Sequence, residues 1–310
     1  MARGSRRGSR PRIAITLGDP RGIGPEVTAR ALDDRSLRDV ADFVLVGPSG
    51  TATAPEVETG TWVPHGGGAL AGQLAGAAIE RAVAMARDGE VDGIVTAPID
   101  KAALLAGGYA WPGHTEMLAA LTGTETAMML ASDRLRVVLA TTHVPLRAVP
   151  DLVTIELLVR IAEITRAGLT AWFGLPAPRI ALCALNPHAG DSGRFGAEDD
   201  AVLAPAARQA GLLGPFPADT VFVRAIRGEF DAVIAPYHDV GMTAIKVASF
   251  GSAVNVTLGL PFPRTSPDHG TALDIAGKGI ADPSSMIRAM RGCAAIVRTA
   301  RSAVRGQRSE

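Results

Sequence analysis

Three histidines occupy equivalent places in this 310-residue chain, because each directly follows a short apolar run that reads as a buried strand. They are His143 in TTHVPLR, His188 in LNPHAGDSG and His238 in APYHDVG. Three imidazoles that leave one coordination position open form a common catalytic site for a divalent metal ion. Asp239 or Asn186 could orient a ligating ring from behind. For each histidine taken alone, a loop side chain satisfied by local hydrogen bonds is the alternative; the position shared by all three favours the metal site.

Two further groups of polar residues suit an anionic ligand. In GHTE, His114 and Thr115 precede a helical run, where free backbone N–H groups attract negative charge. Simple capping by Thr115 is the alternative there. Lys246, Asn255 and Arg264 bracket a strand and a proline-rich turn, and their cations and amide suit a phosphate or carboxylate, although surface cations are common. Asn255 is the more informative, because an amide inside an apolar strand needs partners.

Glycine-rich segments at 18–26 (GDPRGIGPE) and 65–72 (HGGGALAG) match neither the dinucleotide fingerprint nor the P-loop. The first reads as a tight turn into a helix, with Pro25 in the first helical turn. These motifs alone therefore do not predict a nucleotide.

The elements that must position these residues alternate along the chain. Short runs rich in Val, Ile and Ala predict strands, several of them continuous as in strands covered on both faces, and amphipathic stretches between them predict helices. This order predicts an α/β fold with a largely parallel sheet, whose strand C-terminal ends carry the unusual residues. Strands are expected at 13–17, 43–46, 93–96, 137–142, 180–185, 232–235 and 254–258, and helices at 73–87, 152–167, 197–209 and 284–301.

Composition excludes several classes of protein. Lys plus Arg balance Asp plus Glu at 31 each, so no net field favours nucleic acid or a membrane surface. No apolar run reaches the roughly 18–20 residues of a membrane helix. Cys183 and Cys293 read as small buried hydrophobes, which indicates a cytoplasmic protein. Residues 1–11, rich in Arg, Gly and Ser, predict a disordered tail without the apolar centre of a signal peptide.

Eight segments occur in the order found in one known family: ITLGDPRGIGPE, TAPIDKAAL, GHTEML, TTHVPLR, LNPHAGDSGRFG, PADTVF, YHDVG and NVTLGLPFPRTSPDHGTALDIAGKG. Through these segments the chain, over roughly residues 12–290, resembles the 4-hydroxythreonine-4-phosphate dehydrogenase family. The resemblance implies two α/β/α lobes like those of isocitrate and isopropylmalate dehydrogenases, with the active-site cleft between them. Residues 12–125 with about 265–305 would form the cofactor-side lobe, and about 126–264 the lobe for metal and dimer contacts.

The resemblance also implies roles for individual residues. The three histidines become ligands of a divalent metal (Zn²⁺, Mg²⁺ or Co²⁺), and the enzyme becomes a homodimer whose site draws on both subunits. Asp219 and Lys101 are candidates for the general base, together with a metal-bound hydroxide. Substrate contacts carry over to His114, Thr115, Lys246, Asn255 and Arg264.

The run DHGTALDIAGKG is similar to the adenosine-binding stretch of isopropylmalate dehydrogenase, which places His269, Gly270 and Asp274 at an NAD cofactor. An acidic residue there accepts hydrogen bonds from the ribose hydroxyls and repels a 2′-phosphate, which favours NAD over NADP.

The implied reaction oxidises 4-phosphooxy-L-threonine to 2-amino-3-oxo-4-phosphooxybutanoate, which decarboxylates to 3-amino-2-oxopropyl phosphate on the route to pyridoxal 5′-phosphate. The chain departs from the family at Asp100, often Asn or His, and at Val240, usually Gln. Val240 removes a polar group beside a predicted ligand, so a sister-group dehydrogenase of D-threonate or D-erythronate 4-phosphate stays an alternative. A metal-dependent phosphohydrolase, which would release phosphate without NADH, and an idle binding protein are alternatives of other classes.

Overall fold

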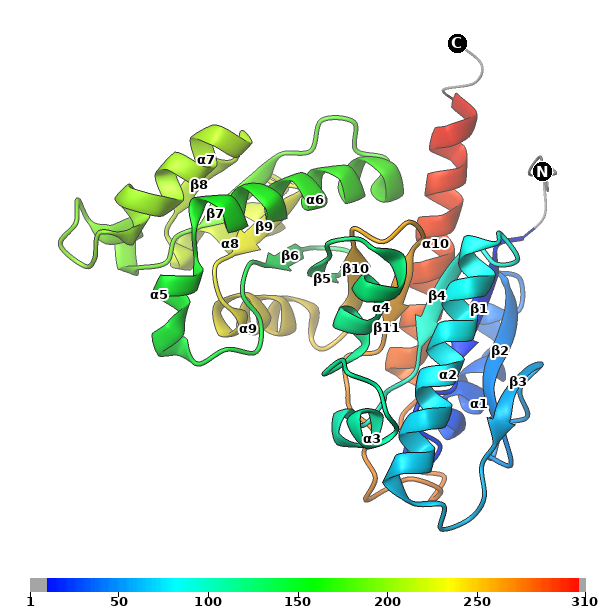
Figure 1. Cartoon of the computed structure of the whole chain (residues 1–310). Helices are drawn as coiled ribbons and strands as arrows, with labels where there is room; N and C mark the ends of the chain where they lie inside the picture. Colours follow the sequence, from blue (N-terminus) through cyan, green and yellow to red (C-terminus); the bar gives the residue numbers. More distant parts are fainter. Residues whose placement is uncertain (1–9, 307–310) are drawn as a thin grey trace. The chain divides into compact units, whose positions relative to one another are not determined.

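The computed structural model describes residues 10–306, which form two compact α/β units (Figure 1). Unit 1 comprises the described residues up to Glu125 and again from Leu260, and unit 2 comprises Thr126–Gly259. The expected disordered tail at 1–11 lies outside the described residues, apart from its last two positions.

Unit 1 contains a sheet in the order β3-β2-β1-β4-β11, in which every neighbouring pair is parallel. Its continuous apolar runs, as in Ile13, Ile15 and Ile94, are fully buried because helices cover both faces. The strands are β1 (Arg12–Thr16), β2 (Asp42–Ser49), β3 (Val57–Thr61), β4 (Gly93–Thr96) and β11 (Arg264–Ser266). The helices are α1 (Gly24–Leu32), the 3₁₀ turn η1 (Arg35–Leu37), α2 (Gly67–Arg87), α3 (Lys101–Ala106), α4 (His114–Thr122) and α10 (Ser284–Gly306).

Unit 2 contains strands in the order β10-β5-β6-β9-β7-β8. β5 pairs antiparallel with β10 and β6, whereas the pairs from β6 to β8 are parallel. The strands are β5 (Ala127–Ala131), β6 (Arg136–Leu139), β7 (Ile180–Cys183), β8 (Leu213–Phe216), β9 (Ala232–Ala235) and β10 (Val254–Leu258). The helices are η2 (Leu146–Ala148), α5 (Val149–Leu152), α6 (Ile155–Phe173), η3 (Pro187–Gly190), the π-helical turn η4 (Asp199–Leu203), α7 (Ala204–Ala210), α8 (Ala218–Ile226) and α9 (His238–Ser249).

The predicted α/β class and largely parallel pairing are confirmed, with β5 as the antiparallel exception. One expected helix, 152–167, begins later than predicted, at Ile155. The Thr154 hydroxyl accepts a hydrogen bond from the backbone N–H of Leu157 at 3.1 Å and so caps α6 there.

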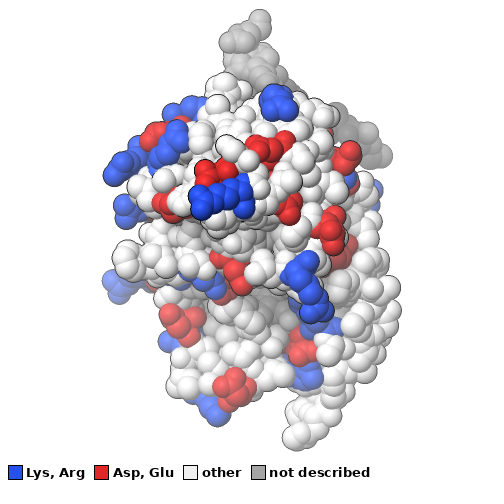
Figure 2. All heavy atoms as spheres, turned by 90° about the vertical axis from the view of Figure 1, so that its left-hand side faces the viewer, with Lys and Arg blue, Asp and Glu red and all other residues white. Residues whose placement is uncertain are grey.

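Charge and hydropathy agree with the expectations from composition. In the described part of the chain, no helix is both long and apolar enough to cross a membrane. Figure 2 shows basic and acidic side chains interspersed on the face drawn, with much uncharged surface between them. Cys183 and Cys293 are buried and form no disulfide.

Candidate functional site

The three predicted metal ligands follow three adjacent strands of unit 2. β6, β9 and β7 are parallel neighbours in that order, and His143, His238 and His188 lie in the segments that leave their carboxyl ends. Because the carboxyl ends of parallel strands meet at one edge of a sheet, the topology brings these segments to the edge where α/β proteins bind ligands.

Two of the three rings are close together. The centroids of the His143 and His238 rings lie 5.4 Å apart, and the rings are tilted by 46°. His238 Nδ1 lies 2.7 Å from a carboxylate oxygen of Asp239, a contact that orients the ring and leaves Nε2 available as a metal ligand. The His188 ring instead faces Phe195, at 6.3 Å between centroids. Within residues 10–306, no three His, Cys, Asp or Glu side chains gather closely enough to hold one metal ion.

The loop that carries His188 has an unusual backbone. His188, Ala189, Asp191 and Ser192 all have φ between 45° and 57°, in the left-handed region that side chains other than glycine rarely adopt. The buried carboxylate of Asp199 accepts the backbone N–H groups of Leu185 (2.9 Å) and Asn186 (3.0 Å) and anchors the start of the loop.

The residues that hold the predicted histidine ligands and their loops in place were only partly predictable from the sequence. Asp239 orients His238 as expected, whereas Asn186 does not orient a ring, because its Nδ2 donates to Glu198 at 2.8 Å. Asp199 was missed; its signal was the acidic run that closes the same loop.

One of the predicted anion-binding residues of unit 1, Arg264, is a buried cation. Arg264 opens β11, is 2 % exposed, and donates from Nη2 to the Thr96 hydroxyl at 2.5 Å. Burial lowers the pKa of Arg264 to about 10. Burial, and then the charge of Arg264, lower the pKa of His114 well below its usual value, so His114 is neutral at pH 7. The buried Nε2 of His114 has no hydrogen-bond partner among the described residues.

His114 and Thr115 are the first residues of α4, and the alternative in which Thr115 caps this helix is wrong. The N-cap is Gly113, which has an extended backbone and no side chain that could accept a capping hydrogen bond. A Cβ at Gly113 would lie 3.3 Å from Glu116 Oε2 and 3.6 Å from Lys101 Cε, so the position is tightly enclosed. The Lys101 side chain, a candidate base, therefore runs beside the start of α4.

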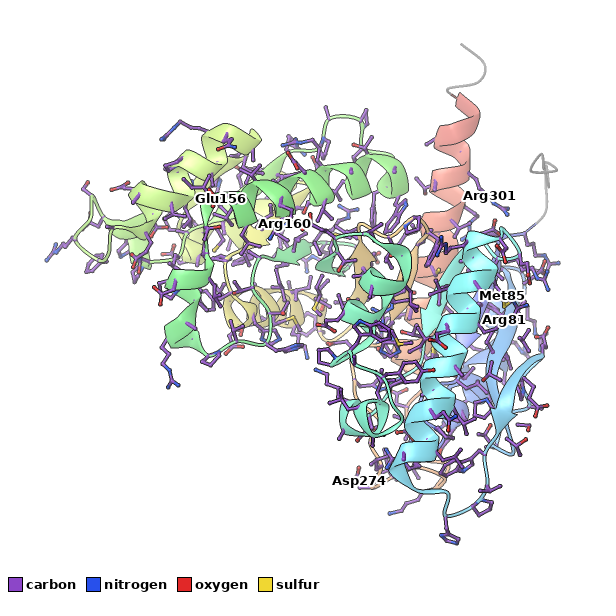
Figure 3. All side chains as sticks on the ribbon, in the orientation of Figure 1. Arg81, Met85, Glu156, Arg160, Asp274 and Arg301 are labelled. Atoms are coloured by element: carbon purple, nitrogen blue, oxygen red, sulfur yellow. The ribbon has the colours of Figure 1, made fainter. Side chains whose placement is uncertain are left out.

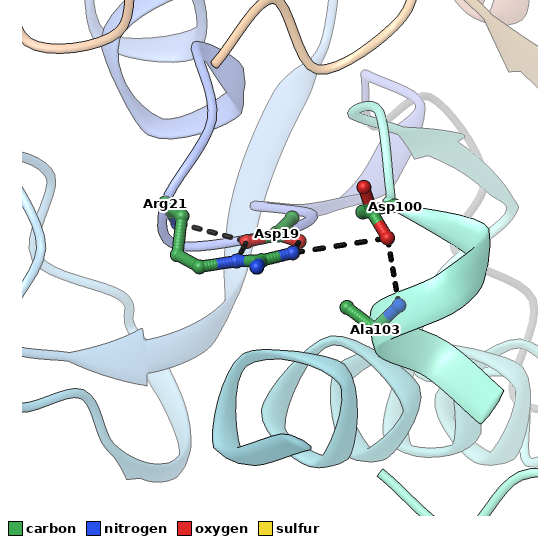
Figure 4. Close-up of polar contacts among 4 residues, drawn as sticks. All are labelled: Asp19, Arg21, Asp100 and Ala103. Atoms are coloured by element: carbon green, nitrogen blue, oxygen red, sulfur yellow. Dashed lines mark hydrogen bonds and ion pairs between the residues drawn. The ribbon is translucent and has the colours of Figure 1, made fainter. Parts of the chain in front are cut away.

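A cluster missed by the sequence analysis joins the loops after β1 and β4 (Figure 4). The Arg21 guanidinium donates two hydrogen bonds to the buried Asp19 carboxylate, at 3.0 and 2.7 Å, and the Arg21 pKa is raised by that hydrogen bond. Arg21 Nη2 also lies 3.8 Å from Asp100, which caps α3 by accepting the Ala103 N–H at 2.7 Å. Asp100, the departure from the family pattern, thus belongs to a charged network beside Lys101.

The predicted cofactor residues lie in the turn segment between β11 and α10. Asp274 is exposed (Figure 3), and His269 Nδ1 lies 3.0 Å from the Gly270 carbonyl oxygen. A pocket of about 400 Å³ in unit 1 is lined by the later part of this segment, Ala276, Gly277 and Gly279, but not by the predicted cofactor residues themselves. Its other walls are the β1–α1 and β2–β3 connections, Pro25 and Glu26 at the start of α1, and Trp62.

The remaining predicted residues belong to unit 2. Asp219, near the start of α8, and Lys246, on α9, are exposed. Asn255 is half-buried in β10, and its Oδ1 is buried with no partner within the described chain. The predicted substrate set is therefore divided, with His114, Thr115 and Arg264 supplied by unit 1.

Comparison with known proteins identifies the family. A family model described as pyridoxal phosphate biosynthetic protein PdxA matches residues 39–293. The chain belongs to the PdxA family. It is 45% identical to a Methylorubrum populi protein, with 90% of this chain and 92% of the relative covered, and 46% identical to one from Aromatoleum aromaticum, with 93% and 97% covered. A Klebsiella pneumoniae crystal structure is 38% identical with a TM-score of 0.83, over 94% of this chain and 99% of that one.

All three relatives are named 4-hydroxythreonine-4-phosphate dehydrogenase. PdxA membership confirms the predicted family, its α/β dehydrogenase fold and the assignment of the chain as an oxidoreductase.

Proposed function

We propose that this PdxA-family protein oxidises 4-phosphooxy-L-threonine with NAD⁺, in a metal-dependent reaction that yields 2-amino-3-oxo-4-phosphooxybutanoate. The product then decarboxylates to 3-amino-2-oxopropyl phosphate. The observation that carries the proposal is the placement of His143, His238 and His188 at the ends of three adjacent parallel strands, in a chain so similar to enzymes of that name.

The chemistry of the three imidazoles suits a divalent metal such as Zn²⁺, Mg²⁺ or Co²⁺, and binding would require His188 to turn from Phe195 toward His143 and His238. Three imidazoles follow one sheet edge, and the carboxylate of Asp239 holds one of them in a coordinating orientation. A metal bound there supplies a Lewis acid that favours loss of the proton from the substrate alcohol. Lys101, beside the start of α4, and the exposed Asp219 are the candidate bases for that proton.

The substrate phosphate suits the buried cluster of unit 1. Arg264 remains a cation at pH 7 even with its pKa lowered to about 10, and a buried cation favours an anionic partner. Neutral His114 offers a hydrogen bond instead of a second charge, and Thr115 adds a hydroxyl at the start of α4. Lys246 and Asn255, to which the resemblance also assigns substrate contacts, belong to unit 2.

The turn segment that contains His269, Gly270 and Asp274 fits a nicotinamide cofactor, which accepts the hydride when bound. Gly277 and Gly279 have no side chains, so only backbone borders the pocket there and a ligand can approach closely. Their φ of 74° and 70° lies in the region that favours glycine. The exposed carboxylate of Asp274 suits ribose hydroxyls and disfavours a 2′-phosphate, which supports NAD over NADP.

We further propose a cytoplasmic homodimer whose site draws on both subunits. Large apolar side chains on and near α9 support an interface on unit 2, since Val247 is 69% and Phe250 93% exposed.

The test is NADH formation by purified protein, stripped with a chelator and reloaded with Zn²⁺, Mg²⁺ or Co²⁺. We expect metal-dependent NADH from 4-phosphooxy-L-threonine, and a loss of about 100-fold or more in His188→Ala. His65→Ala, at an exposed loop histidine, is the matched control and should keep full activity. Turnover only with D-threonate or D-erythronate 4-phosphate would move the protein to the sister group. Phosphate release without NADH would replace the proposal with a phosphohydrolase.

A further inference from the structure

Helix α1 holds the turn segment that borders the unit 1 pocket. Residues 271–281 contain neither helix nor strand, yet Ala276, Gly277 and Gly279 form one wall of the pocket. The shape of such a segment must come from contacts outside itself.

The first contact lies at the start of the segment. The backbone N–H of Ile23 donates to the Thr271 carbonyl oxygen at 2.9 Å. A Cβ at Gly22 would lie 2.8 Å from that oxygen, so the two backbones approach as closely as glycine allows.

The second set of contacts comes from two side chains of α1. Glu26 accepts the Gly277 N–H at 3.0 Å on one carboxylate oxygen and the Ala281 N–H at 3.2 Å on the other. Arg30, one helical turn later, donates to the carbonyl oxygens of Gly279, at 3.3 Å, and Ala281. These four bonds alternate between donors and acceptors of the segment and fix residues 277–281 along α1.

We propose that Glu26 is a positioning residue that sets the affinity for the nicotinamide cofactor by holding the 276–281 wall of the pocket. The inference rests on the proposed function, which assigns this segment to the cofactor. Glu26 itself borders the pocket, but both of its carboxylate oxygens are engaged by backbone N–H groups of the segment, so the carboxylate acts on the cofactor mainly through the segment. Charge-assisted bonds of this kind are about twice as strong as neutral ones.

Three variants test the role. In Glu26→Gln the amide keeps one acceptor but turns an NH₂ group toward a backbone donor, and in Glu26→Asp the charge stays but the shorter side chain cannot reach both N–H groups. We expect the KM for NAD⁺ to rise roughly tenfold to a hundredfold in both, because two charge-assisted hydrogen bonds weaken. Arg30→Ala, at an exposed side chain, should raise the same constant by a smaller factor and serves if the Glu26 variants fold poorly.

Only the cofactor constants should change. The kcat at saturating NAD⁺ and the KM for 4-phosphooxy-L-threonine should stay at the wild-type values. NADH affinity, measured by energy transfer from tryptophan with Trp62 in the pocket wall, should fall in parallel. Amide exchange at Gly277 and Ala281 should quicken while the β1 amides stay protected. Glu90→Gln, which removes an ion pair with Arg81 (3.3 Å) away from the pocket, is the matched control.

Unchanged NADH affinity in the three variants would overturn the inference while leaving the proposed function intact. A loss of kcat and stability together with a rise in both KM values would also overturn it, because that pattern belongs to a merely structural residue. Wild-type protein that neither binds NADH nor reduces NAD⁺ would defeat the proposed function, and this inference with it.

Discussion

At the residue scale, the loop that carries His188 combines backbone strain with chemistry. Each residue other than glycine in the left-handed region costs on the order of 1–2 kcal/mol, and this loop holds four of them within five positions. Strain of this kind persists only where surrounding contacts enforce it, and it clusters at functional sites. Asp199 supplies one such contact from a fully buried position.

We predict that Asp199→Asn weakens metal binding by about 10- to 100-fold, because the start of the His188 loop loses one of its two backbone acceptors. The free energy of unfolding should fall by about 1–3 kcal/mol for the N–H left unsatisfied. Calorimetric titration with Zn²⁺ measures the first effect and urea unfolding the second. Asp200→Asn, at the exposed neighbouring residue, controls for the lost charge. Equal zinc affinity in wild type and Asp199→Asn would show that the contact of Asp199 with the His188 loop does not support the proposed metal site.

Sequence reasoning reached some of these residues and not others for a physical reason. His143, His188 and His238 were found because strand ends are readable from local hydropathy, and parallel pairing then places them at one edge. Two contacts were not predicted: the hydrogen bond from the Asn186 backbone N–H to Asp199, and the ion pair of Arg21 with Asp100 in another loop. Such contacts depend on how loops fold back or meet in space, which no local spacing specifies.

At the element scale, glycines let α2 approach its neighbours closely. A Cβ at Gly72 would lie 1.7 Å from the Ala103 carbonyl oxygen of α3, and one at Gly76 would lie 2.0 Å from the ring of Tyr109. α3 begins with Lys101 and is capped by Asp100, so this contact helps to fix the candidate base. Glycine weakens an isolated helix, yet here tertiary packing requires it.

Gly72→Ala tests this packing through the sign of its effect. By helix propensity alone the substitution would stabilise α2 by roughly 0.5–1 kcal/mol. Because the new methyl group would meet the α3 backbone, we expect a net loss of about 1–3 kcal/mol in the free energy of unfolding. Gly270→Ala, at a position with open space and no positive φ, is the control. A stabilised Gly72→Ala protein in thermal and urea unfolding would show that α2 and α3 have room to separate.

The same balance between local preference and packing explains which elements the sequence predicted. β4, β9 and β10 match the expected ranges residue for residue, because each is rich in the β-branched residues Val, Ile and Thr. Four strands were missed. β3 is polar and half-exposed, β8 contains a proline, and β11 is the three polar residues RTS, whereas β5 is apolar but consists of Ala, Met and Leu, which favour helices. Helix α2 was predicted from residue 73 but begins at Gly67, since the glycines of its first turns suggested a loop.

At the scale of the whole molecule, the chain has no formal net charge at pH 7. Self-repulsion is therefore small near neutrality, and the pH dependence of stability there reflects individual groups whose pKa differs between the folded and unfolded states. Burial raises the thiol pKa of both Cys183 and Cys293 to about 12, far above this range. Burial raises the pKa of Asp231, but hydrogen bonds and ion pairing with Arg179 outweigh it and lower the pKa, so Asp231 changes the stability only near and below pH 3.8, its ordinary pKa. The lowered pKa of His114, by contrast, makes the stability depend on pH between pH 5 and 6.5, the ordinary pKa of histidine.

We predict that stability falls as the pH drops below 6.5, the ordinary pKa of histidine, because of His114. The unfolded chain protonates this imidazole there, whereas burial and Arg264 keep it neutral in the folded protein, so acid favours the unfolded state. The slope from this one group approaches about 1.4 kcal/mol per pH unit and vanishes above its unfolded pKa. Urea unfolding at several values between pH 5 and 7 measures it, with His114→Gln expected to flatten the slope and His65→Gln, at an exposed histidine, to preserve it. If the wild-type and His114→Gln slopes coincide, the His114 imidazole takes up its proton in the folded state as readily as in the unfolded chain, and the proposed phosphate site would then hold a second cation beside Arg264.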